Sequence, residues 1–200
     1  MSMYDELVPQ FHKMLGGLER WLEEGEAFAT ARELDLDALL TARLYPDQLN
    51  LTRNIQAATD TAKLAVARLA AVDAPNHEDG PATLPQLRAR IAEVSAYLQA
   101  ADRDAVDAGA ARVLTLPFLP GQTVVGRDYV RQFAVPNFYF HLTTSYAILR
   151  NLGVKLGKRT FIGSLPLREL SERRRRTSIS PTASQAPSAG ALPPEAQPQP

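Results

Sequence analysis

The sequence contains no cysteine among its 200 residues, and its only histidines are His12, His77 and His141. Without cysteine the chain cannot form disulfides, use a thiolate nucleophile or hold zinc through sulfur. No two histidines stand at the HxxxH or HExxH spacing, and no ExxH occurs, so the usual helical zinc and di-iron motifs are absent. The glycines form neither a dinucleotide-binding pattern nor a phosphate-binding loop.

The chain also lacks an excess of charge of either sign and has no long apolar run. The 22 Lys and Arg balance the 22 Asp and Glu, so the chain lacks the positive excess of a dedicated nucleic-acid binder. No run approaches the ~20 apolar residues of a membrane-spanning helix, and the first fifteen residues lack the apolar core of a signal peptide. We therefore expect a cytoplasmic protein with neither nucleic acid nor membrane as a partner.

Apolar residues recur at three- and four-residue spacing in several long stretches, which is typical of amphipathic helices. A capping box formed by Thr83 and Gln86, and the prolines and β-branched residues of 112–125, mark a helix start and a hairpin. We predict long helices over residues 3–29, 46–71, 84–98 and 126–153. The fold class that follows is all-α, an antiparallel four-helix bundle with a short β-hairpin before the last helix.

The composition changes near residue 165, so we predict two parts. Residues 1–165 form the helical bundle, and residues 166–200 form a basic linker and a disordered tail rich in Pro, Ser and Ala. Within that tail the four arginines 173–176 precede Thr177 and Ser178, a string that fits a basophilic kinase site or an import signal. A solvated basic linker is the interpretation we favour.

The last predicted helix carries most of the candidate chemistry. Asn137, His141 and Ser145 lie four residues apart, so they form one polar stripe on an otherwise apolar helix. Pro136 removes one backbone hydrogen bond there and predicts an irregularity about one turn before His141. A polar stripe drawn into an apolar interior must find partners, water or a ligand.

Three stretches carry a resemblance to a known family: RLYPDQ at 43–48, NIQAATDTAK at 54–63 and NFYFHLTTSYAILRNLG at 137–153. Over residues 1–163 the chain resembles the DinB/YfiT-like superfamily and, within it, the family called domain of unknown function 1993. The resemblance implies a four-helix bundle, dimerisation and a divalent metal that activates a small thiol. The family's ligand positions fall on Asn137 and His141, and near Gln56 in the second long helix.

These positions leave three hypotheses open. In the first, a bundle pocket binds a small molecule, with His141 as general base. In the second, a divalent metal held by His141, Gln56 and Asn137 serves a thiol transferase or isomerase, although amide oxygens bind zinc or nickel weakly compared with imidazole. In the third, the chain is a homodimeric structural or interaction protein, in which His141 and Asn137 bond each other and Gln56. The binding residues expected for the pocket are Gln56, Asp60, Asn137, His141, Tyr139 and Tyr146.

Overall fold

The computed structural model describes residues 2–168, which are mostly helical. The first helix, α1 (Met3–Thr30), begins where the Ser2 hydroxyl accepts a hydrogen bond from the Asp5 amide. Its apolar stripe is buried along its whole length, from Leu7 to Trp21 and beyond. The predicted helix over 3–29 is thus present almost to the residue, because both its cap and its stripe are local features.

The second long helix, α3 (Leu51–Ala70), begins five residues later than predicted. The prediction used Pro46 as the first helical residue, but Asn50 is the N-cap, and its side-chain oxygen accepts from the Arg53 amide. A short helix, α2 (Leu36–Thr41), precedes it and packs against its first turn, where the Thr52 hydroxyl donates to the Leu40 carbonyl at 3.1 Å. The start of α3 is therefore set by a side-chain cap and by its contact with α2.

The next segment runs through α4 (Leu84–Gln99), α5 (Arg103–Gly109) and the hairpin strands β1 (Val113–Thr115) and β2 (Thr123–Val125). The capping box at Thr83 and the antiparallel hairpin are confirmed, with Leu114 opposite Val124. The sequence analysis missed α5. Glycine is required at Gly109 and Gly126, because a Cβ on either would collide with backbone, that of Leu69 in the first case and of Gly109 in the second.

The last long helix is continuous but changes register. It comprises α6 (Gly126–Tyr129), a π-helical turn η1 (Val130–Ala134) and α7 (Val135–Asn151), and the short α8 (Lys158–Ile162) follows. Pro136 has no amide hydrogen, so it cannot make the α-helical hydrogen bond to the carbonyl of residue 132. Just before it, the Val135 amide bonds to the Val130 carbonyl, five residues back, which is the hydrogen bond of a π-helical turn. The irregularity predicted from Pro136 is therefore a π-turn immediately before the candidate residues.

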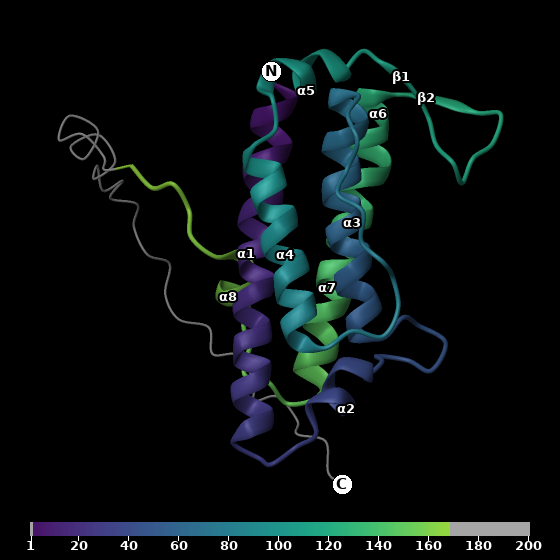
Figure 1. The fold of residues 1–200 in the computed structure, drawn as a ribbon. Helices are drawn as coiled ribbons and strands as arrows, with labels where there is room; N and C mark the ends of the chain where they lie inside the picture. The colour runs from purple at the N-terminus through teal and green to yellow at the C-terminus, as the bar shows by residue number, and fades with distance from the viewer. Residues whose placement is uncertain (1, 169–200) are drawn as a thin grey trace, which may run out of the picture. The chain divides into compact units, whose positions relative to one another are not determined.

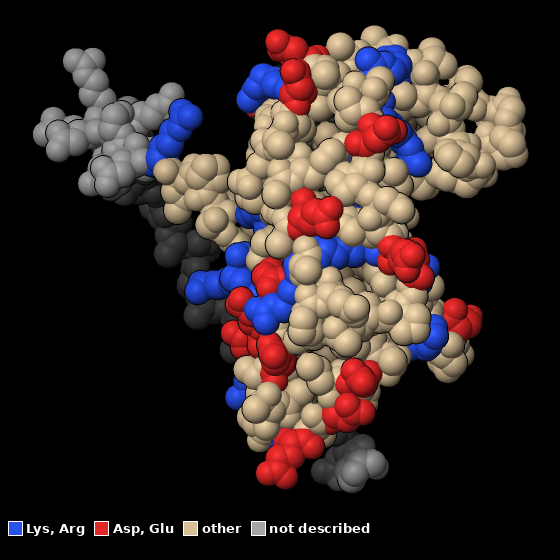
Figure 2. All heavy atoms as spheres, viewed as in Figure 1, with Lys and Arg blue, Asp and Glu red and all other residues tan. Residues whose placement is uncertain are grey.

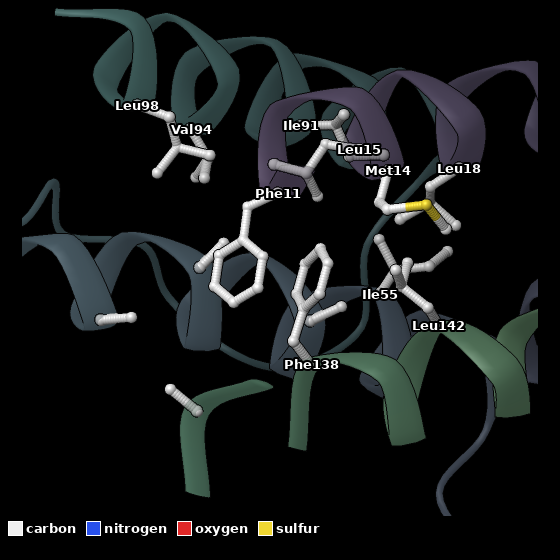
Figure 3. Close-up of a cluster of buried hydrophobic side chains, with 14 of the residues drawn as sticks. Phe11, Met14, Leu15, Leu18, Ile55, Ile91, Val94, Leu98, Phe138 and Leu142 are labelled. Atoms are coloured by element: carbon white, nitrogen blue, oxygen red, sulfur yellow. The ribbon is translucent and has the colours of Figure 1, made fainter. Parts of the chain in front are cut away.

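The four long helices α1, α3, α4 and α7 lie side by side, with α5 and the hairpin at one end and α2 at the other (Figure 1). Helix α3 packs against both α7 and α4, and α1 packs against α4 and α7. The core lies between them, where the rings of Phe11 and Phe138 stack with centroids 4.1 Å apart (Figure 3). None of the helices within residues 2–168 combines the length and the apolar character needed to cross a membrane. Apart from its first three residues, the predicted tail 166–200, with arginines 173–176, lies outside the described residues.

Candidate functional site

His141 lies on the face of α7 that meets α3, and only 8% of the residue is exposed. Four residues further on, Ser145 is fully buried and donates its hydroxyl hydrogen to the His141 carbonyl at 2.9 Å. The predicted polar stripe is thus drawn into the interior at His141 and Ser145, while Asn137 is half-buried. Ser145 is satisfied by its own helix, so the chemistry of the stripe rests on His141 and Asn137.

The His141 ring is held by Asn54, a residue of α3 that the sequence analysis did not select. The Asn54 side-chain nitrogen donates to the carbonyls of Leu49 and Asn50, both at 2.9 Å, which directs its oxygen toward His141. That oxygen lies 3.0 Å from His141 Nδ1, so Nδ1 carries the proton and donates it. Burial lowers the pKa of His141 below its ordinary value of 6.5, which favours the neutral ring. Within residues 2–168, His141 Nε2 has no hydrogen-bond partner.

Asn137 makes a second polar bridge between the same two helices. Its side-chain nitrogen donates to the Thr61 hydroxyl at 2.7 Å, and that hydroxyl donates to the Ala57 carbonyl at 2.7 Å. The network proposed for the interaction-protein hypothesis, in which His141 and Asn137 bond each other and Gln56, is therefore wrong in its partners. Each residue instead reaches across to its own partner on α3, Asn137 to Thr61 and His141 to Asn54.

A shallow hollow of about 320 Å³ opens beside this bridge, lined by Asn137 together with residues of the π-turn and of α7. Pro136, Phe133 and Phe140 form most of its wall. The Phe140 ring also meets the His141 ring edge-on, with centroids 5.2 Å apart. The hollow therefore lies one side chain away from His141, at the point where Pro136 disturbs the helix.

Gln56 and Asp60 point to a different face of α3, toward α4 and the loop 73–82. The Gln56 oxygen accepts from Arg53 Nη1 at 2.9 Å, and its nitrogen donates to the Gly80 carbonyl at 3.0 Å. Gln56 lines a hollow of about 420 Å³ on this face, and Asp60 lines another of about 410 Å³. The structure thus places these two predicted site residues apart from Asn137 and His141.

Asp60 belongs to a charged cluster that the sequence analysis also missed. Its Oδ1 lies 2.7 Å from Arg90 Nη2 and 2.8 Å from Lys63 Nζ, although neither contact has the angles of a hydrogen bond. Arg90 and Lys63 are 6% and 4% exposed. Lys63 also reaches His77 Nδ1 at 2.7 Å, so the other ring nitrogen carries the proton that faces Glu93 at 3.1 Å. The sequence could have indicated Lys63, because it is a charged residue on an apolar helix face.

Tyr139 and Tyr146 lie on the side of α7 that faces α1. The Tyr139 hydroxyl accepts a hydrogen bond from the Gln10 side chain at 2.6 Å. Tyr146 meets Trp21 edge-on, with ring centroids 5.7 Å apart. The six predicted binding residues therefore fall into three places: the α3–α7 contact, the α3–α4 contact and the α1–α7 contact.

The residues at the positions implied for a metal do not fit one. Among them only His141 is a strong ligand for zinc or nickel, the Asn137 amide is bonded to Thr61, and the Gln56 amide is held by Gly80 on another face of α3. In the part of the chain that the structure describes, no three His, Asp or Glu side chains gather as metal ligands would. We derive no chemistry through a metal here.

The comparisons with known proteins agree on the family. The family model described as "Domain of unknown function (DUF1993)" matches residues 3–162. A crystal structure of a DinB family member protein from Shewanella denitrificans is 41% identical in sequence, with a TM-score of 0.80, and the match covers 84% of this chain and 95% of that one. No curated protein matches the chain. The chain therefore belongs to the DUF1993 family, a DinB-like family whose function is not known.

Proposed function

We propose that this chain is an antiparallel four-helix-bundle protein of the DinB type that binds a small molecule at His141. The observation that carries the proposal is the state of the imidazole. Its Nδ1–H is committed to Asn54 at 3.0 Å, while Nε2 has no partner within the described residues. His141 Nε2 is not sealed from solvent, so water can satisfy its lone pair, and a ligand that supplies a hydrogen-bond donor can replace that water.

In this tautomer, Nε2 of His141 is a hydrogen-bond acceptor. Because burial lowers the pKa of His141, the ring is neutral at pH 7 and can accept a hydrogen bond or a proton. The hollow beside Phe140 and Asn137 offers an aromatic wall and a polar edge next to the ring. We therefore infer a ligand that combines an apolar or aromatic part with an O–H or N–H group, and His141 would serve as general base if a reaction follows.

The experiment compares three proteins: the natural chain, His141→Ala and His141→Asn. The asparagine variant has a side-chain N–H near the position of Nδ1, so it can keep the bond to Asn54 and loses only Nε2. A thermal-shift screen of small aromatic alcohols and amines should yield binders of the natural chain that neither variant binds. Binders that His141→Asn retains would refute the role of Nε2, because that variant tests the nitrogen without emptying the core.

The metal-dependent thiol transferase or isomerase is the second hypothesis, and the donor set does not favour it. Plasma mass spectrometry of untagged protein purified without chelator, with His141→Ala beside it, tests this directly. We expect no stoichiometric metal in either protein. Near one metal per chain that disappears in the variant would reverse this conclusion and make Asn54 and Asn137 the next residues to test.

One observation favours the homodimeric alternative. Phe140, the residue beside His141, is 60% exposed, and a large exposed aromatic side chain is a frequent contact residue between subunits. Light scattering of the natural chain and of Phe140→Asp measures whether each protein is a monomer or a dimer. A dimer that the aspartate converts to monomer would place the interface at His141 and would make the second subunit part of the site.

A further inference from the structure

A further hollow lies at the end of the molecule that carries α2, and His141 does not line it. Its volume is about 460 Å³, within the range of sites that enclose small ligands. Residues of α2, of the first turn of α3, of the loop before α4 and of the first turn of α4 line it: Asp37, Leu40, Thr41, Asn50, Thr52, Arg53, Gly80, Pro81, Ala82, Thr83 and Gln86. We refer to it as the α2 groove.

Each helix presents one face to the α2 groove. Asp37, Leu40 and Thr41 are three and four residues apart on α2, so they share a face, and Asn50 and Arg53 share one at the start of α3. Leu40 and the loop residues Pro81 and Ala82 supply apolar surface. The groove therefore has an apolar floor with charged groups that come from two different helices.

Arg53 is the basic group, and it is held in place. Its Nη1 donates to the Gln56 oxygen at 2.9 Å and lies 3.1 Å from Asp79 Oδ2. Gln56 is itself 2% exposed and bonded to the Gly80 backbone, so the guanidinium rests on a fixed support. Within residues 2–168, Nε and Nη2 of Arg53 have no partner. The N–H groups on this free edge of the planar guanidinium have the spacing of the two oxygens of a carboxylate.

Asp37 is the acidic group, and no ion pair or side-chain hydrogen bond within the described residues uses its carboxylate. Acidic side chains are numerous around α2 in the face that Figure 2 shows: Glu33, Asp35 and Asp37 are all exposed, with the exposed Arg32 and Arg43 on either side of them in the chain. This field disfavours a simple anion, whereas Arg53 disfavours a simple cation. A molecule that carries one charge of each sign satisfies both groups.

We propose that the α2 groove binds a small zwitterion, a molecule that carries a carboxylate and an ammonium group on an apolar body of amino-acid size. Its carboxylate pairs with the free edge of Arg53, its ammonium group pairs with Asp37, and its apolar part covers Leu40, Pro81 and Ala82. The site is separate from His141 and does not depend on the function proposed there.

The test uses three probes with the same aromatic ring: L-phenylalanine, 3-phenylpropionate with the carboxylate alone, and 2-phenylethylamine with the ammonium group alone. Each is titrated into the ¹⁵N-labelled full chain at constant ionic strength. We expect saturable shifts of the Thr41, Ala82 and Thr83 amides and the Arg53 side chain. Phenylalanine should bind about tenfold tighter than either single-charge analogue.

The variants separate the two charges. Arg53→Gln should weaken phenylalanine and phenylpropionate about tenfold and leave phenylethylamine unchanged or tighter, and Asp37→Asn should show the reverse pattern. Arg127→Gln and Asp104→Asn remove the same charges from exposed positions outside the groove and should change nothing. Thr41→Trp fills the groove while Arg53 itself is unchanged, so it tests the site even where Arg53→Gln fails to fold.

Three outcomes would overturn the proposal: shifts that do not saturate, equal binding of the three probes, or phenylalanine binding that persists in Thr41→Trp. Inorganic phosphate that competes with phenylalanine at the same ionic strength would do so too, because it would identify a plain anion site at Arg53. In the His141→Asn variant, phenylalanine should shift the Thr41, Ala82 and Thr83 amides as it does in the natural chain, whether or not it also binds at His141. This separates the fate of the α2 groove from that of the His141 site.

Discussion

Helix α3 has two polar faces that are built from different chemistry. The face toward α7 is neutral: an amide, a hydroxyl and an imidazole pair across the contact, as Asn54 with His141 and Asn137 with Thr61. The face toward α4 is charged, with Arg90 and Lys63 buried against Asp60. Within residues 2–168 the neutral face leaves one ring nitrogen without a partner, whereas Arg90 and Lys63 on the charged face each contact several acceptors.

The difference follows from the cost of burial. A neutral polar group needs one good partner, so a two-helix contact suffices, and one atom can stay free for a ligand. A buried guanidinium needs most of its donors filled. Arg90 achieves this with the Thr59 hydroxyl at 2.9 Å, the Glu78 carbonyl at 2.9 Å and the Asp79 carboxylate at 3.1 Å. The charged face therefore holds the loop 73–82 in place, and the neutral face carries the ring nitrogen on which the proposed function rests.

The largest expected effect on stability comes from a substitution that disrupts the charged face of α3. Arg90→Met keeps much of the side-chain volume but leaves Asp60 and Asp79 without their shared cation. We expect a loss of about 3–5 kcal/mol in the free energy of unfolding, because the Thr59 hydroxyl, the Glu78 carbonyl and the Asp79 carboxylate together lose the hydrogen bonds of a buried guanidinium, and a hydrogen bond to a charged group contributes about 1.5–3 kcal/mol. Urea denaturation followed by circular dichroism measures it, with the exposed Arg32→Met as the matched control. A loss below about 1 kcal/mol would mean that Arg90 does not anchor the loop.

A smaller effect is expected on the neutral face. Asn54→Leu is close in volume, but it leaves His141 Nδ1–H and the carbonyls of Leu49 and Asn50 without their partner. We expect a loss of about 1–3 kcal/mol, the cost of buried polar groups without hydrogen bonds. The exposed Asn151→Leu is the control for the same denaturation experiment. The ¹⁵N spectrum of His141 should also show mixed tautomers in Asn54→Leu, and an unchanged single tautomer would contradict the role given to Asn54.

The sequence predicted what is local in this fold. The capping box at Thr83, the amphipathic stripes and the hairpin each depend on residues a few positions apart, and the structure contains all of them. The irregularity at Pro136 was predictable for the same reason, although its form as a π-turn depends on where the following helix packs. The start of α3 was misplaced because Pro46 is a common first helical residue, whereas the Asn50 cap decides it.

The candidate site was predictable only in part, because its partners are distant in sequence. His141 and Asn137 could be selected as polar residues on an apolar helix. Asn54, which sets the tautomer of His141, lies 87 residues away from it. Gln56 was selected by the family resemblance, but its partner is the backbone of Gly80, 24 residues away on another face of α3. A helical period shows that two residues share a face, not which neighbouring helix that face meets.

The smallest expected effect concerns pH and tests the state of His141 directly. Burial lowers the pKa of His141 in the folded protein, while in the unfolded chain it returns to about 6.5. As the pH falls through that value, the unfolded chain takes up a proton that the folded protein still refuses, so the folded state loses stability. The contribution of His141 is complete above pH 6.5 and declines below it. Because other groups of the chain also respond to pH, the measurement is the difference in unfolding free energy between the natural chain and His141→Asn, followed from pH 7.5 to 5. That difference should move against the natural chain on acidification. A difference that stays constant with pH, or moves the other way, would mean that the folded protein binds a proton at His141 as readily as the unfolded chain does, and the neutral imidazole on which the His141 site rests would be lost.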